Sequence, residues 1–307
     1  MANLRELSKQ KERFEGGHSL CAGCAEGIIV RTVLHASTDP VVVTNATGCL
    51  EVSTTTFPHT SWQVPWMHVA FENAAATMSG VVEAYNNLRK RGVVKEKINF
   101  VTFGGDGGTY DIGLQSLSGA LERGHDFLYV CLDNEGYMNT GIQRSSATPK
   151  GAWTKTSEVG RAQAGKPERQ KDLTAIAVAH NIDYVAQAAS HNLHDLHAKA
   201  QKAFTFKGAK FMNVLSPCVA GWKYESRLTQ ELSKMAVETC FWPLFEVEKG
   251  IWKLSYDPGP RKKPLVEFFK MQGRFKHLLD PANAALLEEI QQDVDARWEA
   301  LKKKCGQ

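Results

Sequence analysis

The sequence of 307 residues lacks both a long apolar run and a strong charge of either sign. No apolar stretch approaches the roughly 20 residues that a membrane-spanning helix needs, and the polar N-terminus has no apolar signal core. The formal net charge is only +4, which argues against a dedicated nucleic-acid-binding protein with a concentrated basic patch. We therefore expect a cytoplasmic globular protein with no membrane or nucleic-acid partner.

Cysteine is present in an odd number, seven residues, so a complete set of disulfide bonds is excluded. A reducing compartment also disfavours disulfides. Cys21 and Cys24 are three positions apart in the stretch "GGHSLCAGCAEG", where they fit metal ligands, a redox-active pair or two small apolar residues. Cys131 lies in an apolar run and is expected to be a core thiol, while Cys240 and Cys305 have no partner pattern.

Short β-branched runs alternate with longer helical patterns over most of the chain. Strands are predicted at residues 40–45, 98–105, 126–134, 182–188 and 209–218. Helices are predicted at residues 72–92, 111–124, 171–181 and 191–204. This alternation indicates an α/β fold with a mostly parallel sheet and helices on both faces. In such sheets ligands bind beyond the carboxyl ends of the strands.

The alternation stops near Trp242, so two parts are expected. Residues 1–241 form the α/β domain, and residues 242–307 form an extended arm and a terminal amphipathic helix at 281–304. Docking to other subunits and packing on the chain's own domain fit this second part equally well. The segment 141–170 has no clear period and is rich in Ser, Thr, Gly and Pro, which indicates a functional loop.

The stretch "FGGDGGTYDIG" places Asp106 between glycines directly after a predicted strand. Glycines let the backbone approach a phosphate, and a following helix offers free N–H groups to an anion. The next strand ends in "LDNEGYMNTG", which adds the side chain of Asn134 and turn carbonyls at a neighbouring strand end. A tight turn explains an isolated Gly-Asp-Gly, but two adjacent strand ends with oxygen ligands favour one Mg²⁺ that bridges a diphosphate.

These two segments resemble the thiamine diphosphate motif, Gly-Asp-Gly followed on the next strand by asparagine. Together with "GHSLCAGCAEG", "LDNEGYMNTGIQRSSATPKGAW" and "WPLFEVEKGIWKLSY", they resemble the β subunits of multi-subunit pyruvate:ferredoxin oxidoreductases, in the 2-oxoacid:ferredoxin oxidoreductase family. The resemblance extends in order over nearly the whole chain. It implies a thiamine diphosphate-binding fold and oxidative decarboxylation of pyruvate with coenzyme A to acetyl-CoA and CO₂, with electrons passed through a [4Fe–4S] cluster to ferredoxin.

The resemblance also implies site residues. The diphosphate would be bound by the first turn, through Gly105, Asp106, Gly107 and Gly108. Mg²⁺ would be bound by Asp106, Asn134 and the carbonyl group of Gly136. Asn139 matches the catalytic position near the reacting carbon, and Glu26 matches a cofactor-contacting glutamate, although it stands in Cys-Ala-Glu where the family has Cys-Gly-Glu. Further cofactor contacts are expected from Cys49, Glu135, Tyr137 and Met138.

Members of this family bind one [4Fe–4S] cluster beside the thiamine through four cysteines, and the matching positions are Cys21, Cys24, Cys49 and Cys218. Independently of the resemblance, Cys49 follows the first predicted strand and Cys218 ends a later one, so both are expected at the ligand-binding edge. Spacing alone fits iron–sulfur and structural zinc equally. The thiamine motif favours iron–sulfur because the oxidation needs an electron acceptor.

The family supplies from a different subunit the glutamate that activates the thiamine ring. We therefore expect a hetero-oligomer with α-, γ- and δ-type subunits, and with ferredoxin, coenzyme A and a 2-oxoacid as partners. Pyruvate, 2-oxoisovalerate, 2-oxoglutarate and oxalate stay open as substrates, and a non-catalytic iron–sulfur or zinc-binding module is the alternative of another class. His18, His59 and His68 fit packing or solvent roles better than catalysis. Arg144 fits a substrate carboxylate, a coenzyme A phosphate or the plain surface.

Overall fold

Runs of valine and other apolar residues form a central β-sheet. The computed structural model describes residues 8–306, and within them eight strands form one sheet in the order β2-β1-β3-β4-β6-β5-β7-β8. These strands are β1 (Val41–Ala46), β2 (Trp66–Val69), β3 (Asn99–Gly105), β4 (Leu128–Asp133), β5 (Tyr184–Ala189), β6 (Lys210–Leu215), β7 (Phe245–Glu248) and β8 (Ile251–Leu254). Neighbouring strands are parallel from β2 to β5, and β7 and β8 are antiparallel additions. The predicted α/β fold with a mostly parallel sheet is confirmed.

Helices cover both faces of this sheet, which explains why its central strands β3, β4, β5 and β6 are buried along almost their whole length. Val101 and Val130 pack on one face against α2 (Glu26–His35) and α7 (Leu193–Ala203). Alternate residues of the same strands pack on the other face against α4, α5 and α6. The remaining α-helices and the π-helix η1 are α3 (Cys49–Thr54), α4 (Ala74–Lys90), η1 (Gly107–Ile112), α5 (Leu114–Glu122), α6 (Leu173–Ala179), α8 (Val219–Trp222), α9 (Thr229–Glu238), α10 (Leu265–Lys270) and α11 (Ala284–Lys304).

Two elements, α3 and β2, lie where no helix or strand is predicted from the sequence. The segment between Ala46 and Val69 contains α3 and the edge strand β2, which pairs with β1. Neither is long enough to show a clear period, because α3 has six residues and β2 has four. The predicted helix at 111–124 corresponds to α5, which begins only at Leu114, because residues 111 and 112 belong to η1, a π-helix of the kind often found at functional sites.

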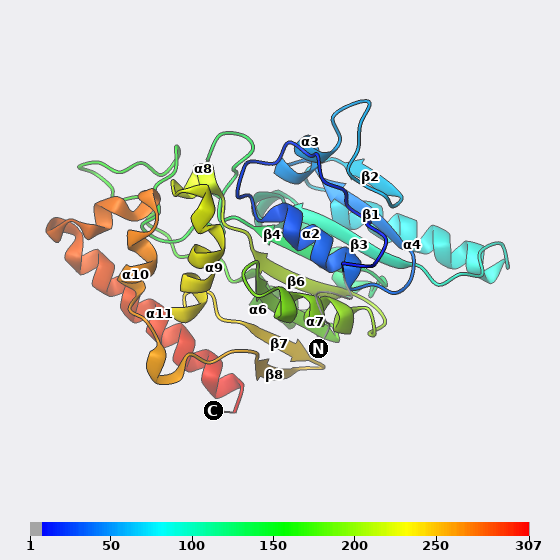
Figure 1. Cartoon of the computed structure of the whole chain (residues 1–307). Helices are drawn as coiled ribbons and strands as arrows, with labels where there is room; N and C mark the ends of the chain where they lie inside the picture. The colour runs from blue at the N-terminus through cyan, green and yellow to red at the C-terminus, as the bar shows by residue number, and fades with distance from the viewer. Residues whose placement is uncertain (1–7, 307) are drawn as a thin grey trace.

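The segment after Trp242 is joined to the sheet and to the helices beside it. β7 pairs with β5, and β8 pairs with β7. The helices α10 and α11 pack with α9 around a third apolar cluster that includes Phe241, Phe268 and Phe275. Figure 1 shows α10 and α11 in orange and red beside the sheet, with β7 and β8 at its lower edge. A domain boundary at residue 241 and a subunit-docking role for residues 242–307 stay predictions.

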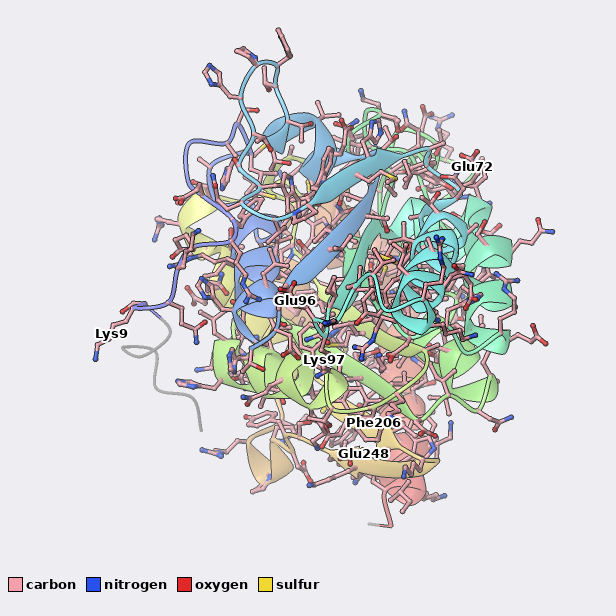
Figure 2. The ribbon with its side chains drawn as sticks, turned by 90° about the vertical axis from the view of Figure 1, so that its right-hand side faces the viewer. Lys9, Glu72, Glu96, Lys97, Phe206 and Glu248 are labelled. Atoms are coloured by element: carbon pink, nitrogen blue, oxygen red, sulfur yellow. The ribbon has the colours of Figure 1, made fainter. Side chains whose placement is uncertain are left out.

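Figure 2 shows the sheet from the side of its edge strand β2, with Glu72 before α4 near the top and Glu248 of β7 near the bottom. Among residues 8–306, we find no helix with the length and apolar character that crossing a bilayer requires.

Candidate active site

The carboxyl ends of four neighbouring strands bring the predicted site residues to one edge of the sheet. Asp106 directly follows β3 and Asn134 directly follows β4, the adjacent strand. Cys49 opens α3 after β1, and Cys218 caps α8 after β6. Because β1, β3, β4 and β6 are consecutive in the parallel sheet, segments far apart in the sequence meet at this edge.

Asp106 and Asn134 face each other at the centre of the edge, and both are buried, with 1% and 6% exposure. The backbone N–H of Asn134 donates to Asp106 Oδ1 at 3.3 Å, and Ser145 Oγ donates to Asp106 Oδ2. The side-chain oxygen of Asn134 lies 2.8 Å from both Asp106 Oδ1 and the carbonyl oxygen of Gly136. Three oxygen atoms in this arrangement need a bound cation, a proton on Asp106, whose pKa burial raises well above its ordinary value, or rotation of the amide, after which Nδ2 donates to both acceptors.

A bound cation would let Asn134 keep its hydrogen bond to Glu26, whereas rotation of the amide would break it. In the present orientation Asn134 Nδ2 donates to Glu26 Oε1 at 3.3 Å, and rotation would replace this donor by an oxygen. Oxygen ligands about 2.1 Å from an octahedral Mg²⁺ lie about 3 Å from their neighbours. The observed 2.8 Å separations match this spacing. The three oxygens therefore fit part of a magnesium coordination sphere.

Glu26, at the start of α2, is a buried carboxylate with a free oxygen. Its side chain is 4% exposed, and burial raises its pKa to about 7, against the opposing effect of the hydrogen bond from Asn134. Its Oε2 atom has no hydrogen-bond partner. A buried polar atom without a partner costs free energy, so Oε2 fits a contact with a bound group.

The glycines of the Gly-Asp-Gly turn differ in what surrounds them. A Cβ atom on Gly107 would lie 2.4 Å from the ring of Tyr137, and one on Gly108 would lie 3.0 Å from the carbonyl oxygen of Phe71. Only glycine therefore allows this packing. No atom lies within 4 Å of the Cβ position of Gly105, so the space beside Gly105 is open.

A cavity of about 300 Å³ opens beside the turn and the loop after β4. It is lined by Thr47, Gly48, Cys49, Phe71, Gly107, Asn134, Gly136, Tyr137, Met138, Asn139 and Thr140. Asn139 is exposed at this cavity, while Tyr137 is half-buried and its hydroxyl group donates to Asp111 Oδ2 at 2.9 Å. The predicted cofactor loop thus forms one wall of a cavity that also reaches Cys49.

The four predicted cluster ligands are free thiols near this edge: Cys21, Cys24, Cys49 and Cys218. Burial raises the pKa of Cys218 to about 11, and it raises the pKa of Cys24 and Cys49 further. Cys21 is the exposed member of the set, and its nearness adds slightly to the raised pKa of both Cys49 and Cys218. Within the described part of the chain, no three or more His, Cys, Asp or Glu side chains lie in a metal-binding arrangement. The four-cysteine set therefore stays a prediction.

His18, His59, His68 and Arg144 differ in their surroundings. His18 stacks on Phe14, with ring centroids 5.5 Å apart. His68 Nε2 is 2.6 Å from the hydroxyl oxygen of Thr47, which lines the cavity. His59 and Arg144 are exposed. Cys131 and Cys240 are buried in the apolar core, and Cys305 packs against it.

Sequence reasoning missed several residues that hold the site together. Ser145 lies in the segment 141–170, which the sequence marks as functional, but nothing identifies its contact with Asp106. Arg274 forms a buried ion pair with Glu135, and Trp222 Nε1 donates to the carbonyl oxygen of Asn134 at 2.7 Å. These contacts join residues far apart in the sequence, so no local pattern signals them.

Comparisons with known proteins lead to the same cofactor as the geometry of the strand ends. Residues 46–214, more than half of the chain, match the family model of the thiamine pyrophosphate enzyme C-terminal TPP binding domain. Pyruvate synthase subunit PorB of Thermotoga maritima is 49% identical over 97% of this chain and 95% of that protein. The chain belongs to the PorB family. The predicted family membership is confirmed, and the matched domain supports thiamine diphosphate as the cofactor.

Three further proteins are similar to this chain. The PorB protein of Methanocaldococcus jannaschii is 49% identical over 95% of this chain and 97% of that protein. Ketoisovalerate oxidoreductase subunit VorB of Pyrococcus abyssi is 39% identical over 95% of this chain and 93% of that protein. The solved 2-oxoglutarate:ferredoxin oxidoreductase of Magnetococcus marinus has a TM-score of 0.57 at 18% identity, covering 74% of this chain and 81% of that one, and shares the fold.

Proposed function

We propose that this PorB-family chain is the thiamine diphosphate-binding β subunit of a pyruvate:ferredoxin oxidoreductase. The reaction converts pyruvate and coenzyme A to acetyl-CoA and CO₂, and the two electrons released reduce ferredoxin. Near full-length similarity to proteins named pyruvate synthase subunit PorB supports this reaction. The structural observation that carries the proposal is the convergence of the Asp106, Asn134 and Gly136 oxygens beside the buried Glu26.

The diphosphate and Mg²⁺ would be held by the ends of β3 and β4. Asp106 Oδ1, Asn134 Oδ1 and the carbonyl oxygen of Gly136 would ligate the cation, as their spacing and chemistry suit a hard, oxygen-preferring ion. The open space beside Gly105 would let a diphosphate approach the backbone closely. Ser145 would hold Asp106 in place through its hydrogen bond to Oδ2.

Bound thiamine diphosphate supplies the carbon nucleophile and the electron sink for decarboxylation. Glu26 Oε2, which is buried and has no partner, would accept a hydrogen bond from the cofactor and orient it. Met138 and Tyr137 would form the wall of the cavity that limits access of water. Asn139, at the same cavity, would position the substrate near the reacting carbon.

Cys21, Cys24, Cys49 and Cys218 would hold a [4Fe–4S] cluster, which supplies an electron acceptor when bound. Cys49 lines the same cavity as Asn139, so a cluster at these thiols would lie close to the reacting centre. The backbone N–H of Gly221 points to Cys218 Sγ at 3.4 Å, and such hydrogen bonds tune the reduction potential of a cluster. Other subunits, one of them supplying the thiamine-activating glutamate, would complete the enzyme and transfer electrons to ferredoxin.

Anaerobic purification of the complex that contains this chain tests the proposal. We expect bound thiamine diphosphate and Mg²⁺, together with a broad visible absorbance that reductant bleaches. Pyruvate and coenzyme A should together support ferredoxin reduction and CO₂ release. Zinc in place of iron, or a complex without thiamine diphosphate, would contradict the proposal and favour a non-catalytic binding module.

Another 2-oxoacid is the second candidate, because the VorB relative is 39% identical over almost the whole chain. Rates of ferredoxin reduction with pyruvate, 2-oxoisovalerate, 2-oxoglutarate and oxalate, each with and without coenzyme A, separate these substrates. We expect the highest kcat/KM with pyruvate and a requirement for coenzyme A. A higher kcat/KM with 2-oxoisovalerate would assign the chain to the ketoisovalerate enzymes.

A further inference from the structure

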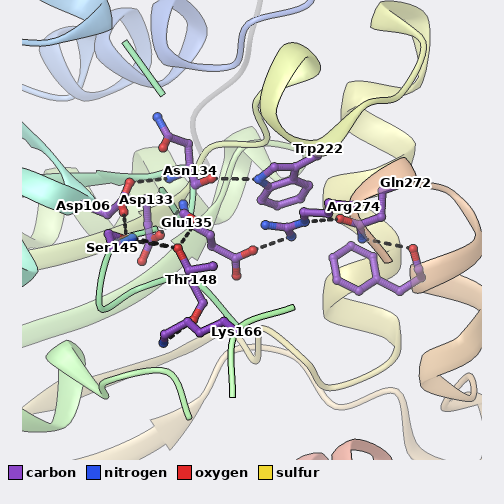
Figure 3. Close-up of polar contacts among 11 residues, drawn as sticks. Asp106, Asp133, Asn134, Glu135, Ser145, Thr148, Lys166, Trp222, Gln272 and Arg274 are labelled. Atoms are coloured by element: carbon purple, nitrogen blue, oxygen red, sulfur yellow. Dashed lines mark hydrogen bonds and ion pairs between the residues drawn. The ribbon is translucent and has the colours of Figure 1, made fainter. Parts of the chain in front are cut away.

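Arg274 is a buried cation that reaches the candidate cofactor loop from the C-terminal part of the chain. It lies on the 3₁₀ helix η4 (Gly273–Leu279) and is 2% exposed. Its Nη2 atom pairs with Glu135 Oε2, and its Nε atom donates to Gln272 Oε1 at 2.7 Å. Figure 3 shows this line of contacts from Gln272 through Arg274 to Glu135.

Glu135 stands between Asn134 and Gly136, which carry two of the three converging oxygens. Its backbone has φ +62°, the left-handed region that costs free energy for a residue other than glycine. Its side chain is fully buried, so the carboxylate needs a cation or strong donors. Arg274 is the cation that the structure places against it.

The backbone of Glu135 is also fixed at both of its polar groups. Its N–H donates to Asp133 Oδ1 at 3.0 Å, and Thr148 Oγ1 donates to its carbonyl oxygen at 2.8 Å. Thr148 is anchored in turn by the buried Lys166, whose Nζ atom donates to the Thr148 carbonyl oxygen at 2.7 Å. The strained turn is thus held by the side chain and the backbone together.

A second contact connects Arg274 to the other side of the turn. The guanidinium carbon of Arg274 lies 3.8 Å from the centre of the Trp222 ring, close enough for a cation–π interaction. The Nε1 atom of that ring donates to the carbonyl oxygen of Asn134. Arg274 therefore supports Glu135 directly and Asn134 through Trp222.

We propose that Arg274 is a positioning residue for the magnesium-binding turn. By anchoring Glu135 in its left-handed conformation, Arg274 keeps Asn134 Oδ1 and the Gly136 carbonyl oxygen at the spacing that a cation requires. The two oxygens flank Glu135, so relaxation of its backbone would move them relative to each other. This inference rests on the proposed thiamine diphosphate function, and it gives the C-terminal segment a role inside the site.

A positioning role and a purely structural role differ in what they do to metal binding. A purely structural arginine would change the melting temperature and leave the affinity of folded molecules for Mg²⁺ unaltered. Loss of a residue that orients metal ligands typically weakens metal binding about 10- to 100-fold. The apparent Kd for Mg²⁺, measured at saturating thiamine diphosphate, separates the two roles without an activity assay.

The test uses the assembled complex with Arg274→Met in the full chain, and Lys270→Met as the matched control. Lys270 lies in the same segment, but its ion pair with Glu267 is at the surface, with side chains 55% and 44% exposed. We expect Arg274→Met to raise the Kd for Mg²⁺ at least about tenfold and Lys270→Met to change it less than about twofold. Arg274→Lys, which keeps the charge but not the planar group, should recover part of the loss.

Removal of Arg274 alone leaves a buried carboxylate without a partner and can prevent folding. The double variant Glu135→Gln/Arg274→Met removes both charges. The Kd for Mg²⁺ is measured on this variant if the single variant does not assemble. A Kd for Mg²⁺ within about twofold of wild type in the assembled variant, whatever its melting temperature, would overturn the inference. Wild-type complex that binds neither Mg²⁺ nor thiamine diphosphate would instead refute the proposed function, so the two failures are distinguishable.

Discussion

Replacement of Asp106 by asparagine changes the candidate site by one charge and almost no volume. Asp106 is 1% exposed, and its hydrogen-bond donors are the Asn134 N–H and the Ser145 hydroxyl group. Burial and the nearby Asp133 raise its pKa well above the ordinary value, because the charged form is poorly solvated. Without a cation, the ionised carboxylate therefore destabilises the folded chain.

The stability order of wild type and Asp106→Asn should reverse when ligands are added. Without ligands, we expect the variant to be at least as stable as wild type, since an amide avoids the desolvation penalty of a buried charge. With Mg²⁺ and thiamine diphosphate at about 100 times Kd, wild type should gain about 2.7 kcal/mol of unfolding free energy. For a chain of this size that gain corresponds to roughly 4 °C in melting temperature. The variant should gain almost nothing.

Melting temperatures of both complexes, with and without the two ligands, test this reversal of the stability order. Equilibrium dialysis measures the affinity of each complex for Mg²⁺. We expect the variant to bind Mg²⁺ at least about 100-fold more weakly than wild type. Loss of a residue that only supports a metal ligand weakens binding about 10- to 100-fold, and loss of a direct ligand should weaken it more. Thr109 lies in η1 just after Asp106, and its hydroxyl donates to the Gly105 carbonyl oxygen at 2.7 Å. Thr109→Ser keeps this hydroxyl and is the control for non-specific damage. An Asp106→Asn complex that is stabilised by the ligands as much as wild type would refute the magnesium site.

Three further predictions concern other parts of the molecule. Cys218→Ala should lower the iron content by about four per chain with loss of visible absorbance, and unchanged iron in elemental analysis would rule out its role as a ligand. Gly107→Ala should weaken thiamine diphosphate binding about tenfold or more, because its Cβ would lie 2.4 Å from the Tyr137 ring, and calorimetry that finds wild-type affinity would contradict this packing. Burial lowers the pKa of His191 to about 4, so the unfolded chain binds the proton first and stability should fall as pH drops from about 6.5 to 4. His191→Gln should reduce this loss, of about 3 kcal/mol, in urea titrations, and an identical pH profile would show that another group is responsible.

The fold was predictable because its central strands carry their own signal. β3 and β4 are buried on both faces, and such strands appear in a sequence as short apolar runs between helices. β2 and α3 were not predictable, because a four-residue edge strand and a six-residue helix are too short to show a period. Their positions depend on pairing with β1 and on packing of the site loop, which are tertiary effects.

The candidate site was likewise predictable from the sequence only in part. Asp106 and Asn134 were identifiable because each directly follows an apolar run, and adjacent parallel strands end at the same edge. The contacts of Ser145 and Arg274 were not, because a buried hydrogen bond or ion pair leaves no periodic trace in the sequence. Arg274 in particular stands in a segment that the sequence assigns only to docking or packing.

By itself, the sequence determined the parallel α/β sheet and the Gly-Asp-Gly turn with its asparagine partner. These features are local, since hydrophobic periodicity and turn chemistry act over a few residues. Only the tertiary structure decided that the side-chain amide of Asn134 comes within 2.8 Å of Asp106 Oδ1 and the Gly136 carbonyl oxygen, and that Arg274 pairs with Glu135 between them. Such distances depend on how the strand ends and the C-terminal helices pack together, and close packing fixes them only in the folded chain.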